Sequence, residues 1–231
     1  MIVVDGLPPL PGWKALVAPT ATVIAADGGA RHARREAVRV TDLVGDLDSL
    51  TAHEVDWFHD RGARVHRFAA DKDFTDFELA ARLAADHRPH GHSSGRARLL
   101  VVGGAGGRLD HALGNIVVLA GADLADFAVT ASIGEAAVQP ASPARGVTAY
   151  GSAGDTVSLL PLFGDAHGVS TVGLRYRLDA ATLDAEAARG VSNTIATPPA
   201  KVVVEEGTVA VVEPRGTARL LATHHPPGGR P

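Results

Sequence analysis

The strongest constraint on the fold is an alternation of short apolar runs and longer helix-like segments along the first half of the chain. The apolar runs are expected to form buried strands, at residues 2–4, 22–26, 43–44, 64–68 and 99–102. The intervening segments have apolar residues at helical spacing and are expected to form helices, at residues 29–38, 51–61, 75–86 and 109–120. Alternation of this kind predicts βαβ units and a parallel sheet, the α/β fold class.

The pattern changes after about residue 123. The second half contains short segments rich in valine and threonine, at residues 128–133, 136–139, 147–150, 156–161, 169–172, 201–205 and 208–212. Gly, Pro or Asp separates them, which is typical of an antiparallel all-β domain and favours a sandwich. We therefore predict an N-terminal α/β domain over 1–124, a C-terminal β-sandwich domain over 125–222 and a flexible tail over 223–231.

The composition restricts the class of protein. A net charge of -4 gives no broad basic face for holding nucleic acid. The absence of cysteine excludes disulfides, thiolate metal sites and a cysteine nucleophile. The chain lacks the basic start and long apolar run of a signal peptide, and no stretch approaches the roughly 20 apolar residues that span a bilayer. We expect a soluble, cytoplasmic protein that binds neither nucleic acid nor membrane.

Acidic or glycine-rich turns follow nearly every predicted strand of the first half. In a parallel sheet these strand ends lie along one edge, which is where open α/β folds bind their ligands. We therefore expect seven carboxylates to converge in one cleft, those of Asp27, Asp46, Asp48, Asp71, Asp73, Asp76 and Asp110.

Converging carboxylates repel one another unless a cation lies among them, and oxygen ligands suit Mg²⁺ bound together with substrate phosphates. Glycine pairs allow the backbone to approach a phosphate, and the helix N-termini beyond them attract anions. Lys72 and Arg108 add positive charge for the oxygens that the metal does not neutralise. The combination indicates phosphoryl-type transfer from a nucleotide.

Each motif also has a purely structural explanation. Residues 27–29 form a common type of turn, and residues 45–49 could form an Asx-turn before the next helix. Thr75 and Glu78 have the spacing of a helix capping box, which accounts for these two residues but not for Asp76.

Other local patterns are less informative. The glycine run at 103–107 matches neither the P-loop nor the Rossmann spacing. His111 follows Asp110 at the predicted cleft, and either a role in the site or packing at the helix start explains it. Because no Ser-His-Asp order or His-Glu-x-x-His motif is present, a hydrolase has no support.

Six motifs, taken in order, resemble those of the thiamine pyrophosphokinase family. Four match its catalytic-domain signatures: Asp-Gly-Gly-Ala at 27–30, Gly-Asp-Leu-Asp-Ser at 45–49, Lys-Asp-Phe-Thr-Asp-Phe-Glu at 72–78 and Gly-Gly-Arg-Leu-Asp-His at 106–111. Two more, Gly-Leu-Arg-Tyr at 173–176 and Gly-Val-Ser-Asn at 190–193, resemble its β-domain signatures. The resemblance covers about residues 22 to 195.

The resemblance implies an α/β catalytic domain that binds ATP and a β-sandwich that binds thiamine. It also implies a homodimer whose active site lies between the catalytic domain of one subunit and the sandwich of the other. Mg²⁺ would be held against the ATP phosphates by Asp46, Asp48 and Asp76.

The remaining motif residues acquire roles by the same resemblance. The residues expected at the nucleotide are Asp27, Gly28, Gly29, Arg31, Lys72 and Thr75. The residues expected at the reacting groups are Asp46, Asp48, Asp73, Asp76, Arg108 and Asp110. The residues expected at thiamine are Tyr176, Ser192 and Asn193, with the last two contributed by the partner subunit.

Two positions depart from the family pattern. Arg31 stands where the family usually has a small polar residue, commonly Asn, and it could contact a phosphate or point to solvent. Tyr176 stands where the family often has Trp, and its ring can still pack against a flat heteroaromatic ring.

The expected reaction is transfer of a pyrophosphoryl group from ATP to the hydroxyethyl group of thiamine, giving thiamine diphosphate and AMP. Two alternatives remain: a pyrophosphokinase for another hydroxymethyl heterocycle such as a pterin, and a non-catalytic module that binds nucleotide or thiamine. Residues 190–193 and the β-domain favour thiamine, and the many acidic positions argue against a silent binder.

Overall fold

The computed structural model describes residues 1–88, 96–106, 108–143 and 145–224. The chain divides into two compact units, Met1–Val129 and Thr130–Pro231. The predicted domain boundary between residues 124 and 125 lies just before this division. The predicted tail lies outside the described residues from 225 onward, and its first two residues end a helix. Among the described residues, no helix has the length and apolar character needed to cross a membrane.

A parallel sheet lies at the centre of the first unit, with the strand order β4-β3-β2-β1-β5. Its strands are β1 (Ile2–Val4), β2 (Ile24–Ala26), β3 (Asp42–Gly45), β4 (Arg64–Arg67) and β5 (Ala97–Gly103). Ile2 lies beside Ile24 on one side and Val101 on the other. All three side chains are buried, which confirms the predicted core strands.

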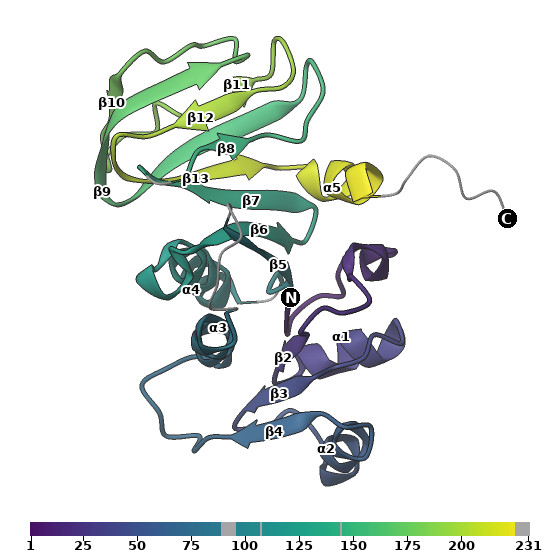
Figure 1. The fold of residues 1–231 in the computed structure, drawn as a ribbon. Helices are drawn as coiled ribbons and strands as arrows, with labels where there is room; N and C mark the ends of the chain where they lie inside the picture. Colours follow the sequence, from purple (N-terminus) through teal and green to yellow (C-terminus); the bar gives the residue numbers. More distant parts are fainter. Residues whose placement is uncertain (89–95, 107, 144, 225–231) are drawn as a thin grey trace, which may run out of the picture. The chain divides into compact units, whose positions relative to one another are not determined.

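Helices cover both faces of this sheet, with α1 and α2 on one face and α3 and α4 on the other (Figure 1). They are α1 (Gly29–Arg35), α2 (Ala52–His59), α3 (Asp76–Asp86) and α4 (Leu109–Ala120), with short 3-10 helices η1 (Trp13–Leu16) and η2 (Ala122–Leu124). In α3, Phe77, Ala80, Ala81 and Ala84 recur at helical spacing and are buried, so one face of the helix packs on the sheet. The predicted α/β architecture is therefore confirmed.

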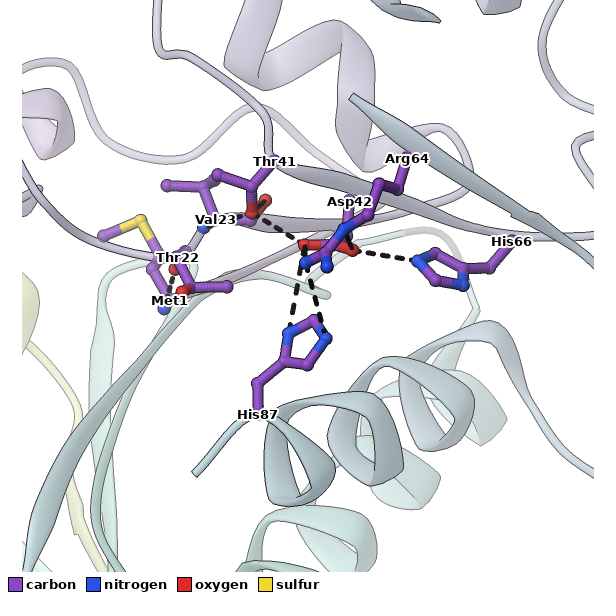
Figure 2. A network of polar contacts seen from close by, with 8 residues as sticks. All are labelled: Met1, Thr22, Val23, Thr41, Asp42, Arg64, His66 and His87. Carbon is purple, nitrogen blue, oxygen red and sulfur yellow. Dashed lines mark hydrogen bonds and ion pairs between the residues drawn. The ribbon is translucent and has the colours of Figure 1, made fainter. Parts of the chain in front are cut away.

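A buried acid joins neighbouring elements at the amino end of β3 (Figure 2). Asp42 is fully buried. Its carboxylate forms an ion pair with Arg64 Nε at 2.9 Å and hydrogen bonds with His66 Nε2 at 2.8 Å and the Thr41 hydroxyl at 2.8 Å. Burial raises the pKa of this carboxyl, but the hydrogen bonds from Arg64, His66 and Thr41 outweigh it and leave the pKa below its usual value. Because these partners lie on β4 and beside β3, the network fixes the edge of the sheet.

The second unit is built from antiparallel strands. They are β6 (Phe127–Ile133), β7 (Ala136–Ala141), β8 (Val147–Thr148), β9 (Thr156–Val172), β10 (Ala181–Leu183), β11 (Asn193–Thr194), β12 (Lys201–Val203) and β13 (Glu206–Glu213). One core lies among them and includes Val157, Leu159, Val169, Ile195, Val202 and Val211. The all-β sandwich predicted for this half is confirmed.

Strand β9 corresponds to two predicted strands joined into one. Its first half pairs with β13, and its second half pairs with β12. The chain bends between these halves, where Phe163 has φ 65° and Gly164 has φ 136°. From the sequence, the glycine at this bend suggests a turn between two strands. In the structure the strand continues through the bend, because β13 and β12 pair with it on either side.

Helix α5 (Gly216–His224) was not predicted from the sequence. Leu220 on this helix is buried, and the Thr217 hydroxyl donates to the Ala136 carbonyl at 3.0 Å. The segment 216–224 has two large apolar residues, Leu220 and Leu221, and they are adjacent, so its helical periodicity is weak in the sequence.

Candidate active site

A cavity of about 460 Å³ opens at the carboxyl edge of the parallel sheet. Loops that follow the sheet strands and the first turns of α3 and α4 line it. Its walls include the predicted residues Asp27, Asp46, Lys72, Thr75, Asp76, Arg108 and His111. The edge predicted to bind ligand is therefore hollow and polar.

Three carboxylates converge in this cavity. Asp27 follows β2, Asp46 follows β3, and Asp76 is the first residue of α3. One oxygen of each lies within 4.8 Å of the others. Gly45 makes this approach possible, because a Cβ there would lie 2.8 Å from Asp76 Oδ1 and 3.2 Å from Asp27 Cβ.

Asp27 is the most enclosed member of this acidic cluster, with 8% of its surface exposed. Its Oδ1 is buried and accepts no hydrogen bond from any described residue. Burial raises the pKa of this carboxyl, and the negative charges of Asp76 and Asp48 raise it further. A buried acceptor without a donor is costly, so this oxygen is suited to a cation.

The Lys72 ammonium lies between the other two acids. Its Nζ is 2.9 Å from Asp46 Oδ2 and 2.9 Å from Asp76 Oδ1. Burial lowers the pKa of Lys72, but the hydrogen bonds and charges of the two carboxylates outweigh it and raise the pKa overall. The hydrogen bond from Lys72 in turn lowers the pKa of Asp46.

The other predicted acids do not line this cavity. Asp48 is exposed, although its N–H donates to Asp46 Oδ1 at 3.2 Å and its charge acts on Asp27. Asp73 lines a neighbouring cavity of about 550 Å³, beside Phe74. The remaining two, Asp71 and Asp110, are exposed. Acids that follow strands at one sheet edge therefore do not all point into the cavity.

The two glycines of the Asp-Gly-Gly turn, residues 28 and 29, differ in what surrounds them. A Cβ on Gly29 would lie 2.3 Å from the Val3 carbonyl oxygen, so this glycine allows α1 to start against β1. A Cβ on Gly28 would instead meet the Asp5 side chain at 2.5 Å. Gly29 is therefore required for packing, whereas Gly28 faces a side chain that can move.

Arg31 binds a neighbouring acid. Its Nε and Nη2 donate to the two Glu54 carboxylate oxygens, each at 2.8 Å. The hydrogen bonds from Arg31 lower the pKa of Glu54 to about 2. This forked pair joins α1 to the start of α2, and Arg31 does not line the cavity.

Thr75 caps α3 and also lines the cavity. Its side chain accepts from the Glu78 N–H at 3.1 Å, as predicted. The Glu78 carboxylate pairs with Arg82 at 3.2 Å, so the described cap uses one half of the expected capping box. Thr75 thus fixes the helix turn that carries Asp76.

The glycine loop after β5 brings backbone to the cavity. Gly103, Gly104 and Gly106 all have positive φ, and Asn115 of α4 donates to the Gly104 carbonyl at 3.1 Å. Gly107 lies outside the described residues. Arg108 Nη2 lies 2.6 Å from Asp110 Oδ2, and the hydrogen bonds from Arg108 lower the pKa of Asp110 to about 2.

Asp5 lines the cavity directly after β1 and was not predicted as a site residue. His32 lies beside it, with Nε2 4.0 Å from Asp5 Oδ1 and 3.1 Å from the Gly6 carbonyl. Asp5 follows the same rule as Asp27 and Asp46, since it is an acid at the carboxyl end of a parallel strand. Applying that rule to the first strand would have found it.

The residues predicted to contact thiamine lie together in the second unit. Asn193 is buried, and its amide donates to the Tyr176 carbonyl at 2.8 Å and accepts from the Tyr176 N–H at 3.0 Å. Tyr176 is 62% exposed. Ser192 is exposed at φ 60°, and its N–H donates to Ser158 Oγ at 3.1 Å. Tyr176 and Ser192 are thus open to a ligand, while Asn193 holds the backbone of Tyr176.

Comparison with protein families gives two matches. Residues 13–130 match the family model described as "Thiamin pyrophosphokinase, catalytic domain", which alone covers more than half of the chain. Residues 146–209 match "Thiamin pyrophosphokinase, vitamin B1 binding domain".

Individual relatives are more distant. The chain is 26% identical over 170 residues to thiamine pyrophosphokinase 1 of Oryza sativa subsp. japonica, covering 73% of this chain. It is 26% identical over 138 residues to thiamine pyrophosphokinase of Bacillus subtilis (strain 168), covering 60% of this chain. In each case the chain spans 61% of the relative's length.

Solved structures show the same fold. The crystal structure of thiamine pyrophosphokinase from Bacillus subtilis has a TM-score of 0.76 at 21% identity, covering 92% of this chain and 96% of that one. Thiamin pyrophosphokinase from Candida albicans has a TM-score of 0.76 at 16% identity, covering 92% and 88%.

Proposed function

Because the chain belongs to the thiamin pyrophosphokinase family, we propose that it transfers a pyrophosphoryl group from ATP to the hydroxyethyl group of thiamine. The products are thiamine diphosphate and AMP. The observation that carries the proposal is the acidic cluster of Asp27, Asp46 and Asp76 with Lys72 in one cavity, at the edge where such sheets bind nucleotides.

The cluster fits a hard divalent cation. Its donors are carboxylate oxygens, and the buried Asp27 Oδ1 has no donor among the described residues. Asp46, Asp76 and Asp27 would hold Mg²⁺, and the exposed Asp48 would add negative charge beside them. When bound, the metal supplies positive charge for the phosphate oxygens.

The remaining chemistry is positioning and charge stabilisation. The thiamine hydroxyl oxygen attacks the β-phosphorus of ATP, and the hydroxyl proton is released to solvent. The bond from that phosphorus to the oxygen bridging it to the α-phosphate breaks as AMP leaves with that oxygen. Lys72 and Arg108 stabilise charge on the transferred group, and the backbone of the 104–106 loop can approach the phosphates closely. The residues proposed to shape the nucleotide-binding part of the site are Asp27, Gly28 and Thr75.

Two acids expected at the reacting groups, Asp73 and Asp110, could accept the hydroxyl proton, but neither is well placed for that role. Asp110 has a pKa of about 2 beside Arg108, so it holds the guanidinium and is a weak base. Asp73 lines the neighbouring cavity. A loose transition state needs little assistance from a base, so the proposal does not depend on one.

The choice of acceptor is tested by competition. Thiamine and a hydroxymethylpterin are supplied together with ATP and Mg²⁺, and the diphosphates are identified by mass spectrometry. We expect thiamine diphosphate as the main product. Pterin diphosphate as the main product would refute thiamine as the acceptor. Binding of nucleotide without any formation of AMP would indicate the non-catalytic binding module.

We further propose a homodimer in which the partner subunit contributes Ser192 and Asn193 to the thiamine site. An exposed apolar stripe on α4 supports association. Leu109, Leu113 and Val117 are 74%, 56% and 49% exposed and recur every fourth residue, so they lie on one face of the helix. A continuous apolar face of this kind is typical of protein interfaces.

The stripe predicts the effect of one substitution on assembly. Leu113→Asp places a charge in the middle of the stripe and should convert a dimer into a monomer of about 23.7 kDa by light scattering. Phe163→Asp is the control, because Phe163 is an apolar residue that is 65% exposed and belongs to β9 instead of α4. A monomeric wild type, or a Leu113→Asp variant that stays dimeric, would contradict the proposed interface.

A further inference from the structure

Lys72 occupies a position that a bound metal would need. Its ammonium lies 2.9 Å from an oxygen of Asp46 and 2.9 Å from an oxygen of Asp76, and its side chain is 13% exposed. These two acids belong to the acidic cluster whose oxygens lie within 4.8 Å of one another. The same oxygens therefore bind an ammonium group in this structure and would bind a metal ion in the proposed function.

The ammonium leaves the acidic cluster incompletely neutralised. The ammonium contacts two of the cluster's three carboxylates, and Asp27 Oδ1 is buried without a donor among the described residues. Close like charges destabilise one another unless a cation lies among them. The cluster is therefore held together by Lys72 but retains a buried oxygen suited to a further cation.

We propose that Lys72 is a built-in counter-ion that exchanges with the metal ion. Without metal, its ammonium holds Asp46 and Asp76 in position. When the metal binds, the ammonium leaves these oxygens and becomes available to the phosphates of the substrate. The proposal rests on the metal site of the proposed function and adds a defined role for the lysine before substrate binds.

Lysine is suited to such an exchange. Its charge is compact and lies at the end of a flexible four-carbon stem, so it can move several ångströms without moving the backbone. Lys72 belongs to the segment between β4 (Arg64–Arg67) and α3 (Asp76–Asp86), which is outside both elements. The ammonium can therefore leave the cluster while Asp76 stays on its helix.

The exchange predicts that removing the ammonium tightens metal binding. Mn²⁺ binding is measured by electron paramagnetic resonance at pH 8 without nucleotide, for wild type, Lys72→Met and Lys14→Met. Lys14 is exposed in the same unit, and its loss changes the net charge equally. We expect Lys72→Met to bind Mn²⁺ about tenfold more tightly, within the roughly 5- to 150-fold range usual for coupled binding. Lys14→Met should match the wild type.

The outcomes separate the exchange from the proposed function. Mn²⁺ binding that is unchanged or weaker in Lys72→Met overturns the exchange and leaves the metal site in place. Failure of the wild type to bind Mn²⁺, with and without ATP, overturns both. The metal-free Lys72→Met protein should also melt below the wild type, because its carboxylates have lost their counter-ion.

A second measurement uses the wild-type protein and does not depend on the variant folding. The chain has three lysines, Lys14, Lys72 and Lys201, so acylation of each can be followed by peptide mass spectrometry. Without metal, Lys72 should react slowly, because its side chain is only 13% exposed and two carboxylates contact its ammonium. Mg²⁺ should speed its acylation severalfold and leave Lys14 and Lys201 unchanged. A Lys72 rate that is unchanged or lower with Mg²⁺ would overturn the exchange.

Discussion

Asp46→Asn is expected to lower kcat at least about 100-fold while the protein stays folded. Asp46 belongs to the acidic cluster, and its carboxylate lies 2.9 Å from the Lys72 ammonium. Asparagine keeps the shape of the side chain but removes the charge that a metal ion requires. Initial rates of AMP formation at saturating ATP and Mg²⁺ measure the loss, and circular dichroism measures the fold.

Two comparison variants make this result specific. Asp56→Asn removes an exposed carboxylate on α2 and should keep wild-type activity. Asp48→Asn should lose less activity than Asp46→Asn, because the Asp48 side chain is exposed and lies outside the cluster. Near-normal activity of Asp46→Asn would refute the assigned metal site.

Gly29→Ala is expected to destabilise the protein by about 3 kcal/mol. The added Cβ would lie 2.3 Å from the Val3 carbonyl oxygen and 2.9 Å from the Val4 carbonyl carbon. Both belong to the backbone of the buried strand β1, so relief requires α1 to move away from the sheet. The free energy of unfolding in urea measures the effect.

Gly28→Ala provides the matched control. Its Cβ would contact the Asp5 side chain, which is 58% exposed and can turn away. We expect a loss below about 1 kcal/mol, close to the range of ordinary surface substitutions. Equal losses in the two variants would show that close packing of α1 on β1 is not the reason for Gly29.

The parallel-sheet unit was predictable because its signals are local. Apolar runs and helical spacing marked each strand and helix, and the rule that parallel strand ends share one edge brought Asp27, Asp46 and Asp76 together. The same rule could not decide which acids point inward. Asp110 lies beside Arg108, and that pairing depends on side-chain directions that spacing does not encode.

Other features depend on contacts distant in the sequence. Arg31 pairs with Glu54, which is 23 positions away, so its departure from the family pattern could not be interpreted locally. The Asn193 side-chain amide forms two hydrogen bonds with the backbone of Tyr176. The Gly-Val-Ser-Asn motif alone does not reveal this contact. Strand β9 stays continuous through Gly164 because β12 and β13 pair with its two halves.

The most direct test of the central claim is AMP formation from ATP and Mg²⁺, measured with and without thiamine by chromatography and mass spectrometry. Our account predicts AMP that depends on thiamine and appears in equal amount with thiamine diphosphate. AMP formation that is indifferent to thiamine, or its absence from folded protein that binds both ligands, would contradict the account.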